Sequence, residues 1–181
     1  MFLSLAKSLY PELGKVKIWD VPSFVKETVF KHKELFDRQK NWFPVTLHDP
    51  CNLAKGLGIV EPQREVLKFL CPNFREMKPS GFYNYCCGGG GGLVLISDER
   101  VRELRIKVGK TIKVQQILNA FGDCIESTEL KYVCAPCLNC RLQLRDLLID
   151  FRSVKVKVGG LTRLVINALK ALPIDIVEDE L

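Results

Sequence analysis

The sequence lacks long apolar runs, and this absence limits where the protein can act. No uninterrupted apolar stretch approaches the roughly 18–20 residues that a membrane-spanning helix needs. The first residues, MFLSLAKSLYPEL, are interrupted by Lys7 too early to form a secretory signal peptide. Although the net charge is +6, there is no arginine-rich arm and no interleaving of basic and aromatic residues, so nucleic acid is not an expected partner. These absences predict a cytoplasmic protein.

Cysteine, by contrast, is plentiful, with eight in 181 residues. Disulfides are rare in the reducing cytoplasm, where clustered cysteines more often bind metal or take part in catalysis. Burial as a small hydrophobic residue accounts for one or two of them, and we expect this of Cys71 and Cys124. The other six need a different explanation.

Hydrophobic spacing alternates along the chain between strand-like and helix-like periods. Strands are expected over 15–20, 44–49, 81–86, 130–135 and 154–158, and helices over 21–39, 61–70, 97–122, 139–151 and 161–172, with a short helix within 2–10. This alternation predicts an α/β fold, with a parallel sheet of about five strands and helices on both faces. The length suits one domain over residues 1–181, and no domain boundary is evident.

The six remaining cysteines follow three of the expected strands. Cys51 follows 44–49, Cys86 and Cys87 end 81–86, and Cys134, Cys137 and Cys140 follow 130–135. Parallel strands end at one edge of the sheet, where ligands of open α/β folds bind. Thiolates from three loops form a soft-ligand site suited to an iron–sulfur cluster or to zinc.

Three alternatives to an iron–sulfur site stay open. Zinc is one, although structural zinc sites usually show two paired hooks, and here only CAPC or CLNC is available. A vicinal disulfide between Cys86 and Cys87 would be strained, and it is rare in a reducing compartment. The third alternative is that the cysteines bind no metal.

Five glycines follow the adjacent cysteines in CCGGGGG, at 86–92. We expect Gly88, Gly89 and Gly90 to contribute to cofactor binding, because backbone without side chains lets a bulky inorganic core approach closely. Successive amides in such a loop can also point their N–H groups at anionic sulfur. No Lys-Ser or Lys-Thr follows the glycines, as a nucleotide-binding P-loop requires.

Three motifs together resemble one known family. HDPC at 48–51, CCGGGGG at 86–92 and CLNCRLQL at 137–144 are similar to the cysteine-rich CCG domain of heterodisulfide reductase catalytic subunits and related iron–sulfur oxidoreductases. The 34 residues between Cys51 and Cys86 fit the family pattern, and the 49 between Cys87 and Cys137 make a longer interval than usual. The resemblance covers roughly residues 5–172 and implies a Rossmann-like fold.

The resemblance also implies a set of site residues. It assigns Cys51, Cys86, Cys87, Cys137 and Cys140 as ligands of one [4Fe–4S]-type cluster, noncubane or cubane, with Cys134 as an alternative ligand. Cys86 and Cys87 would then be catalytic, at a centre that splits or forms a disulfide. His48 lies beside the first ligand and is a candidate to give a proton or a hydrogen bond to a departing thiolate, or else only satisfies a loop carbonyl.

The function implied is that of an iron–sulfur subunit of a heterodisulfide-reductase-like oxidoreductase, exchanging electrons with a disulfide or thiol substrate. Family members commonly carry a ferredoxin-like CxxCxxCxxxCP region that this chain lacks. The resemblance therefore implies a chain truncated at its N-terminus, with a ferredoxin-like, flavoprotein or membrane cytochrome subunit as partner, through which it could associate with a membrane. The alternatives are an electron-transfer subunit without disulfide chemistry, of the glycolate, lactate or flavoprotein–quinone type, and a zinc-binding structural module.

Overall fold

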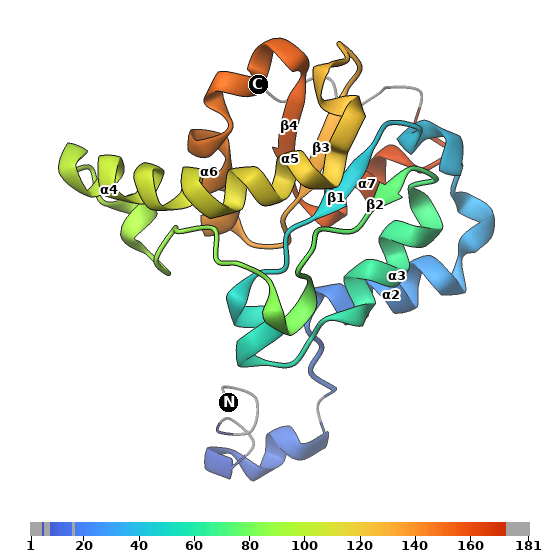
Figure 1. Ribbon diagram of the computed structural model, residues 1–181. Coiled ribbons are helices and arrows are strands. Elements are labelled where there is room, and N and C mark those ends of the chain that lie inside the picture. The colour runs from blue at the N-terminus through green and yellow to red at the C-terminus, as the bar shows by residue number, and fades with distance from the viewer. Residues whose placement is uncertain (1–4, 6–7, 16, 173–181) are drawn as a thin grey trace.

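The computed structural model describes Leu5, residues 8–15 and residues 17–172 (Figure 1). The short helix expected within 2–10 therefore lies largely outside the described residues. Four parallel strands form one sheet in the order β2–β1–β3–β4. They are β1 (Val45–Leu47), β2 (Phe74–Arg75), β3 (Lys131–Cys134) and β4 (Val156–Gly159).

Helices cover both faces of this sheet. The α-helices of the described residues are α2 (Val21–Lys31), α3 (Glu61–Leu70), α4 (Glu99–Gly109), α5 (Gln115–Phe121), α6 (Leu138–Leu147) and α7 (Leu161–Asn167). Two segments are π-helical, Asn52–Gly56 and Lys110–Val114. Short 3₁₀ turns lie at Pro11–Lys15, Lys33–Leu35, Arg38–Asn41, Gly81–Tyr83, Leu93–Leu95, Gly122–Glu126 and Ile149–Val154. Helices α2, α3 and α7 pack on one face, and α5 and α6 pack on the other (Figure 1). The predicted parallel α/β fold with two covered faces is confirmed, with four strands instead of about five.

Alternation along the strands divides the core into two apolar clusters. On β3, Tyr132 packs into the cluster formed with α2, α3 and α7, whereas Val133 packs into the one formed with α5 and α6. Both side chains are almost completely buried, as expected for an inner strand of a parallel sheet covered on both sides. Each fully buried side chain of this size stabilises the fold by roughly 1.5–3 kcal/mol. The sheet is therefore held from both faces.

Two expected strands are wrong, and one strand was not expected. Residues 17–20 form no strand and follow a 3₁₀ turn, and Ile18 and Trp19 are partly exposed there. Residues 81–86 form a 3₁₀ turn and an irregular segment. In that segment the aromatic side chains of Phe82, Tyr83 and Tyr85 are exposed and Asn84 is buried. The fourth strand is instead β2, only two residues long.

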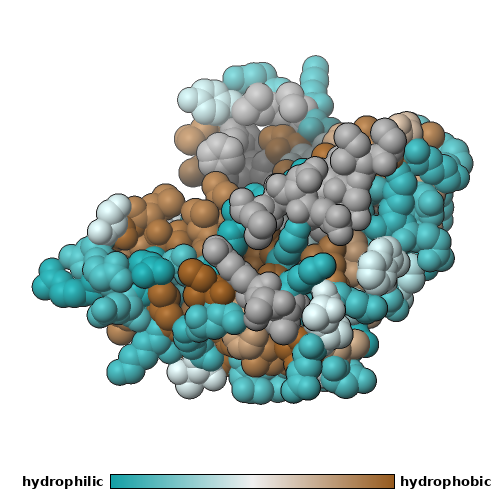
Figure 2. Space-filling view, turned by 90° about the horizontal axis from the view of Figure 1, so that it is seen from above, coloured by the Kyte–Doolittle hydropathy of each residue, from teal (hydrophilic) through white to brown (hydrophobic). Residues whose placement is uncertain are grey.

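The helix expected over 97–122 forms from α4, the π-helical segment Lys110–Val114 and α5 in direct succession. In the view from above, hydrophilic side chains cover the projecting end of α4, and apolar side chains gather beside it (Figure 2). Within the described ranges, no helix combines the length and the apolar character needed to cross a membrane.

Candidate metal centre

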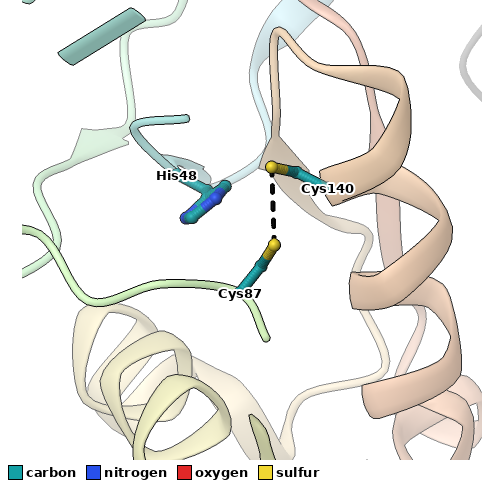
Figure 3. Close-up of side chains that lie close together, drawn as sticks. All are labelled: His48, Cys87 and Cys140. Atoms are coloured by element: carbon teal, nitrogen blue, oxygen red, sulfur yellow. Dashed lines mark hydrogen bonds between the residues drawn. The ribbon is translucent and has the colours of Figure 1, made fainter. Parts of the chain in front are cut away.

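Three side chains from separate segments meet at the carboxyl edge of the sheet (Figure 3). His48 directly follows β1, and its backbone N–H donates to the carbonyl of Cys134 at the end of β3, at 2.8 Å. Cys140 lies in the first turn of α6, and Cys87 lies in the loop that leads into the glycines. One ring nitrogen of His48 and the two sulfur atoms all lie within 4.8 Å of one another.

Both of these cysteines are buried, and a hydrogen bond joins their sulfur atoms. The Cys87 thiol donates to Cys140 Sγ at 3.5 Å, and each residue is 4% exposed. This hydrogen bond raises the pKa of Cys87 to about 11, with burial adding to it. For Cys86, the hydrogen bond to Cys87 and then burial also raise the pKa. A metal that binds these sulfurs must therefore displace their protons.

Backbone amides of the glycine segment point at sulfur. The N–H of Gly88 donates to Cys86 Sγ at 3.3 Å, and the N–H of Gly89 donates to Cys87 Sγ at 3.4 Å. Gly88 has φ +85°, a conformation that favours glycine. A Cβ atom on Gly89 would lie only 3.4 Å from Cys87 Sγ. The segment thus carries amide donors that stabilise negative charge on the two sulfurs.

The remaining cysteines are distributed unequally around this group. Cys51 and Cys86 are exposed, and Cys137 is half-buried as the residue that caps α6. None of the three belongs to the group of His48, Cys87 and Cys140 among the described residues, although each lies on one of the same three loops.

Cys71, Cys124 and Cys134 lie away from this group in different environments. Cys134, considered as an alternative ligand, is fully buried in the cluster on the opposite face of the sheet, together with Cys71. Cys124 lies partly exposed in a 3₁₀ turn. All eight cysteines are free thiols.

A chain of hydrogen bonds that the sequence did not reveal supports His48. Lys113 Nζ donates to Asn84 Oδ1 at 3.0 Å and also to Gln116 Oε1. Asn84 Nδ2 in turn donates to the carbonyl of Asp49 at 3.0 Å and lies 3.3 Å from His48 Nδ1. Because Lys113 can only donate and the carbonyl of Asp49 can only accept, these two contacts together fix which end of the Asn84 amide faces His48.

This orientation determines the state of the imidazole. Burial, followed by the charge of Lys113, lowers the pKa of His48 well below its usual value, so the ring is neutral. Since Nδ1 accepts from Asn84, the ring proton is assigned to Nε2. Among the described residues, Nε2 is buried without a hydrogen-bond partner. His48 therefore keeps one unused N–H donor among the described residues, and one of its ring nitrogens lies within 4.8 Å of both sulfur atoms.

The position of Lys113 within its helix is the sequence feature that could have pointed to it. It lies four residues before Ile117 and eight before Phe121, on the buried stripe of the helical run. A lysine in such a stripe is unusual, because lysine is almost never fully buried unless it is paired. Burial lowers the pKa of Lys113 to about 8, against the opposing attraction of Cys87, Asp49 and Cys86.

A second polar network ties the loops together. Arg64 on α3 donates to Asp49 at 2.7 Å through Nη1 and to Glu76 at 2.9 Å through Nε. The other oxygen of Asp49 accepts from the backbone N–H of Gly81 at 2.7 Å. Asp49 thus joins the loop after β1 to the segment that leads to the adjacent cysteines.

The donors fit a soft metal or an iron–sulfur group. Two buried sulfurs form the inner part of the site, more exposed cysteines lie on the same loops, and amide N–H groups face the sulfur atoms. Thiolates are the ligands that iron–sulfur clusters and zinc use in proteins. Fold and site together define the class: a parallel α/β protein with a cysteine-rich candidate metal site at the carboxyl edge of its sheet.

Comparison with protein families agrees with this class. Residues 45–145 match the family model of the CCG cysteine-rich domain, which is more than half of the chain. The chain therefore belongs to the CCG cysteine-rich domain family, as the motif resemblance predicted.

Curated relatives are similar at modest identity. An "Hdr-like menaquinol oxidoreductase iron-sulfur subunit 2" of Archaeoglobus fulgidus is 30% identical over 152 residues, covering 81% of this chain and 25% of the relative. An "Hdr-like menaquinol oxidoreductase iron-sulfur subunit" of Archaeoglobus profundus is 29% identical over 148 residues, covering 78% of this chain and 24% of the relative. One subunit of the dihydromethanophenazine:CoB--CoM heterodisulfide reductase of Methanosarcina acetivorans is 28% identical over 127 residues, covering 70% and 28%. The chain thus spans about a quarter of the length of these relatives. No solved structure matches.

Proposed function

We propose that this chain is an iron–sulfur electron-transfer component of a heterodisulfide-reductase-like oxidoreductase. The observation that carries the proposal is the meeting of Cys87 and Cys140 at 3.5 Å, with a ring nitrogen of His48 within 4.8 Å of both sulfurs and the Gly89 amide donating to Cys87 Sγ. A [4Fe–4S]-type cluster, noncubane or cubane, would be held by Cys51, Cys86, Cys87, Cys137 and Cys140. When bound, this group would supply one-electron transfers.

Within this proposal, the residues divide into an inner and an outer part. Cys87 and Cys140 are the buried anchors, and the amides of Gly88 and Gly89 stabilise charge on sulfur. Cys86 is exposed, so a disulfide or thiol substrate could reach it. The Nε2–H of His48 can give a hydrogen bond to a departing thiolate; because the ring is neutral, this bond would stabilise the thiolate without transferring a proton.

Partner subunits follow from the names of the relatives. Those names include a heterodisulfide reductase and iron–sulfur components of menaquinol oxidoreductases. We propose that other redox subunits, of ferredoxin-like, flavoprotein or membrane cytochrome type, exchange electrons with this chain. The menaquinol names also support a second form of the function, electron transfer without disulfide chemistry.

Zinc binding is the alternative from a different class. A His, Cys, Cys group within 4.8 Å supplies three of the four ligands of a structural zinc site. Ligation through Nε2 would, however, require the ring proton on Nδ1, which faces the amide donor of Asn84. The assigned tautomer therefore favours His48 as a donor to sulfur over His48 as a zinc ligand.

The test is metal analysis of anaerobically purified protein, with electron paramagnetic resonance before and after a thiol is added. Iron and acid-labile sulfide at about four per chain, with a signal that changes on thiol addition, are expected for direct sulfur chemistry. An unchanged signal would assign electron transfer alone. Stoichiometric zinc, or no metal after reconstitution, would overturn the iron–sulfur proposal. Cys140→Ala is expected to lose iron, and Cys124→Ala, outside the site, serves as the matched control.

A further inference from the structure

Lys113 is a buried cation without a carboxylate partner. It is fully buried, and the hydrogen bonds of its ammonium group go to two neutral side-chain amides, those of Asn84 and Gln116. Within the part of the chain that the structure describes, no carboxylate forms an ion pair with it. Buried Arg64 differs, because it contacts the carboxylates of both Asp49 and Glu76.

Such an arrangement leaves a charge to be compensated. Hydrogen bonds to amide oxygens replace part of the lost hydration of an ammonium group, but they do not neutralise it. Among the described residues, Asp49 is the carboxylate that attracts Lys113, and it already accepts hydrogen bonds from Arg64 and from the Gly81 amide. The other groups placed to attract Lys113, once they are thiolates, are sulfur atoms of the candidate metal centre, those of Cys86, Cys87 and Cys140.

A cluster held by several thiolates would supply the missing negative charge. We infer that Lys113 is the internal counter-cation of the metal centre and, through Asn84, the positioning residue for His48. This inference rests on the proposed function, because it assigns to Lys113 a task at that same centre. Lys113 lies outside all three cysteine motifs, in the helical segment between α4 and α5.

Two consequences follow from the charge and from the hydrogen bonds. A fixed positive charge favours the more negative, reduced state of the centre, so its removal shifts the reduction potential to more negative values. Its removal also takes away one of the two hydrogen bonds that orient the Asn84 amide, the other being the bond of Nδ2 to the carbonyl of Asp49, so the neighbour that sets the ring proton of His48 is held less firmly. Both effects belong to the metal-loaded protein, and neither requires that Lys113 touches iron.

The experiment compares Lys113→Met with the wild-type protein, each in its metal-free and its anaerobically reconstituted form. Lys113→Gln, neutral but still able to hydrogen-bond, is the second variant should Lys113→Met fail to fold. Lys110→Met is the matched control, because Lys110 lies one turn earlier on the same helical run and makes only an exposed ion pair with Asp150, at 2.7 Å. The readouts are iron and sulfide per chain, thermal midpoints and the reduction potential followed by electron paramagnetic resonance.

For Lys113→Met and Lys113→Gln we expect the gain in thermal midpoint on loading to be smaller than in the wild type. We also expect at least a tenfold loss in the equilibrium constant for one-electron reduction, which is about 59 mV toward more negative potential. Lys110→Met should leave both quantities within error of the wild type. If the Lys113 variants load iron as fully as the wild type, with the same potential and the same gain on loading, the inference is wrong.

This outcome is distinct from failure of the proposed function. If the wild type itself takes up no iron and sulfide, the proposed function fails and the inference fails with it. If the wild type loads and the Lys113 variants do not differ from it, the iron–sulfur function stands and the task assigned to Lys113 is overturned. A lower thermal midpoint in the metal-free form alone, with an unchanged reduction potential, would also overturn the inference and leave Lys113 as a structural residue.

Discussion

Replacing Arg64 by methionine is expected to destabilise the metal-free protein more than any change to an exposed arginine. The Arg64 side chain is 5% exposed and the Asp49 side chain is 0% exposed, so solvent cannot take over the lost contact. Removal of one partner of a buried ion pair leaves the other charge uncompensated, at a cost of about 3–5 kcal/mol. Glu76 is 28% exposed and can turn to water, so Asp49 accounts for most of this cost.

The same network predicts how two changes combine. In Asp49→Asn, the amide oxygen can still accept from Gly81, and Arg64 keeps Glu76, so we expect a cost of only about 1–2 kcal/mol. The double variant should cost less than the sum of the two single variants by about 2 kcal/mol, since no buried charge is then left without a partner. Urea unfolding in the presence of a reductant measures all three free energies, provided that the slope stays constant.

Arg100→Met provides the control for this cycle. Its side chain is 90% exposed, so its ion pair with Asp98 is screened by solvent and is expected to contribute little to stability. A cost for Arg64→Met no larger than that for Arg100→Met would refute the argument. Additive behaviour of the double variant would refute the coupling between Arg64 and Asp49.

Three further predictions concern the glycine segment, the ligand set and pH. Gly88→Ala places a side chain at φ +85° and should cost about 1–2 kcal/mol in free energy of unfolding, measured in urea. Cys134→Ala should keep the iron content of the wild type, because Cys134 lies in the opposite core cluster, whereas Cys137→Ala should lower it. Burial raises the pKa of Cys71 to about 12 in the folded protein, whereas a cysteine in the unfolded chain has a pKa of ~8.5. The buried, protonated thiol therefore contributes fully to stability below pH ~8.5, and this contribution is lost as the pH rises from there toward 12. The stability difference between wild type and Cys71→Ala should therefore shrink by about 1.4 kcal/mol between pH 7.5 and 9.5.

Each of these three predictions has a contrary result. Unchanged stability of Gly88→Ala would show that the backbone relaxes to a conformation that alanine tolerates. Loss of iron in Cys134→Ala, with iron retained in Cys137→Ala, would show that Cys134 is a ligand and Cys137 is not. A stability difference for Cys71→Ala that does not vary with pH would mean that the thiol ionises as easily in the folded state as in the unfolded chain.

Much of the fold followed from local pattern, and the exceptions have physical causes. Helices α3, α6 and α7 and strands β1, β3 and β4 lie where periodicity predicted them, within a few residues. The segment 81–86 did not follow its pattern, because Asn84 is pulled inward by His48, Asp49 and Lys113 while its aromatic neighbours stay outside. Strand β2 was missed because a strand of two residues carries no period.

The sequence by itself determined the class of the protein and the composition of its site. Alternating periods predicted a parallel sheet, and cysteines placed after its strands predicted a metal-binding edge, because the ends of parallel strands share one side. The glycines after Cys87 likewise predicted amide donors to sulfur.

Only the tertiary structure decided which groups actually meet. It brought Cys87 and Cys140 together beside His48, left Cys51 and Cys86 more exposed, and delivered Lys113 from a distant helical segment. The reason is geometric: distances between side chains of different segments depend on how helices pack against the sheet, and no local pattern encodes that packing.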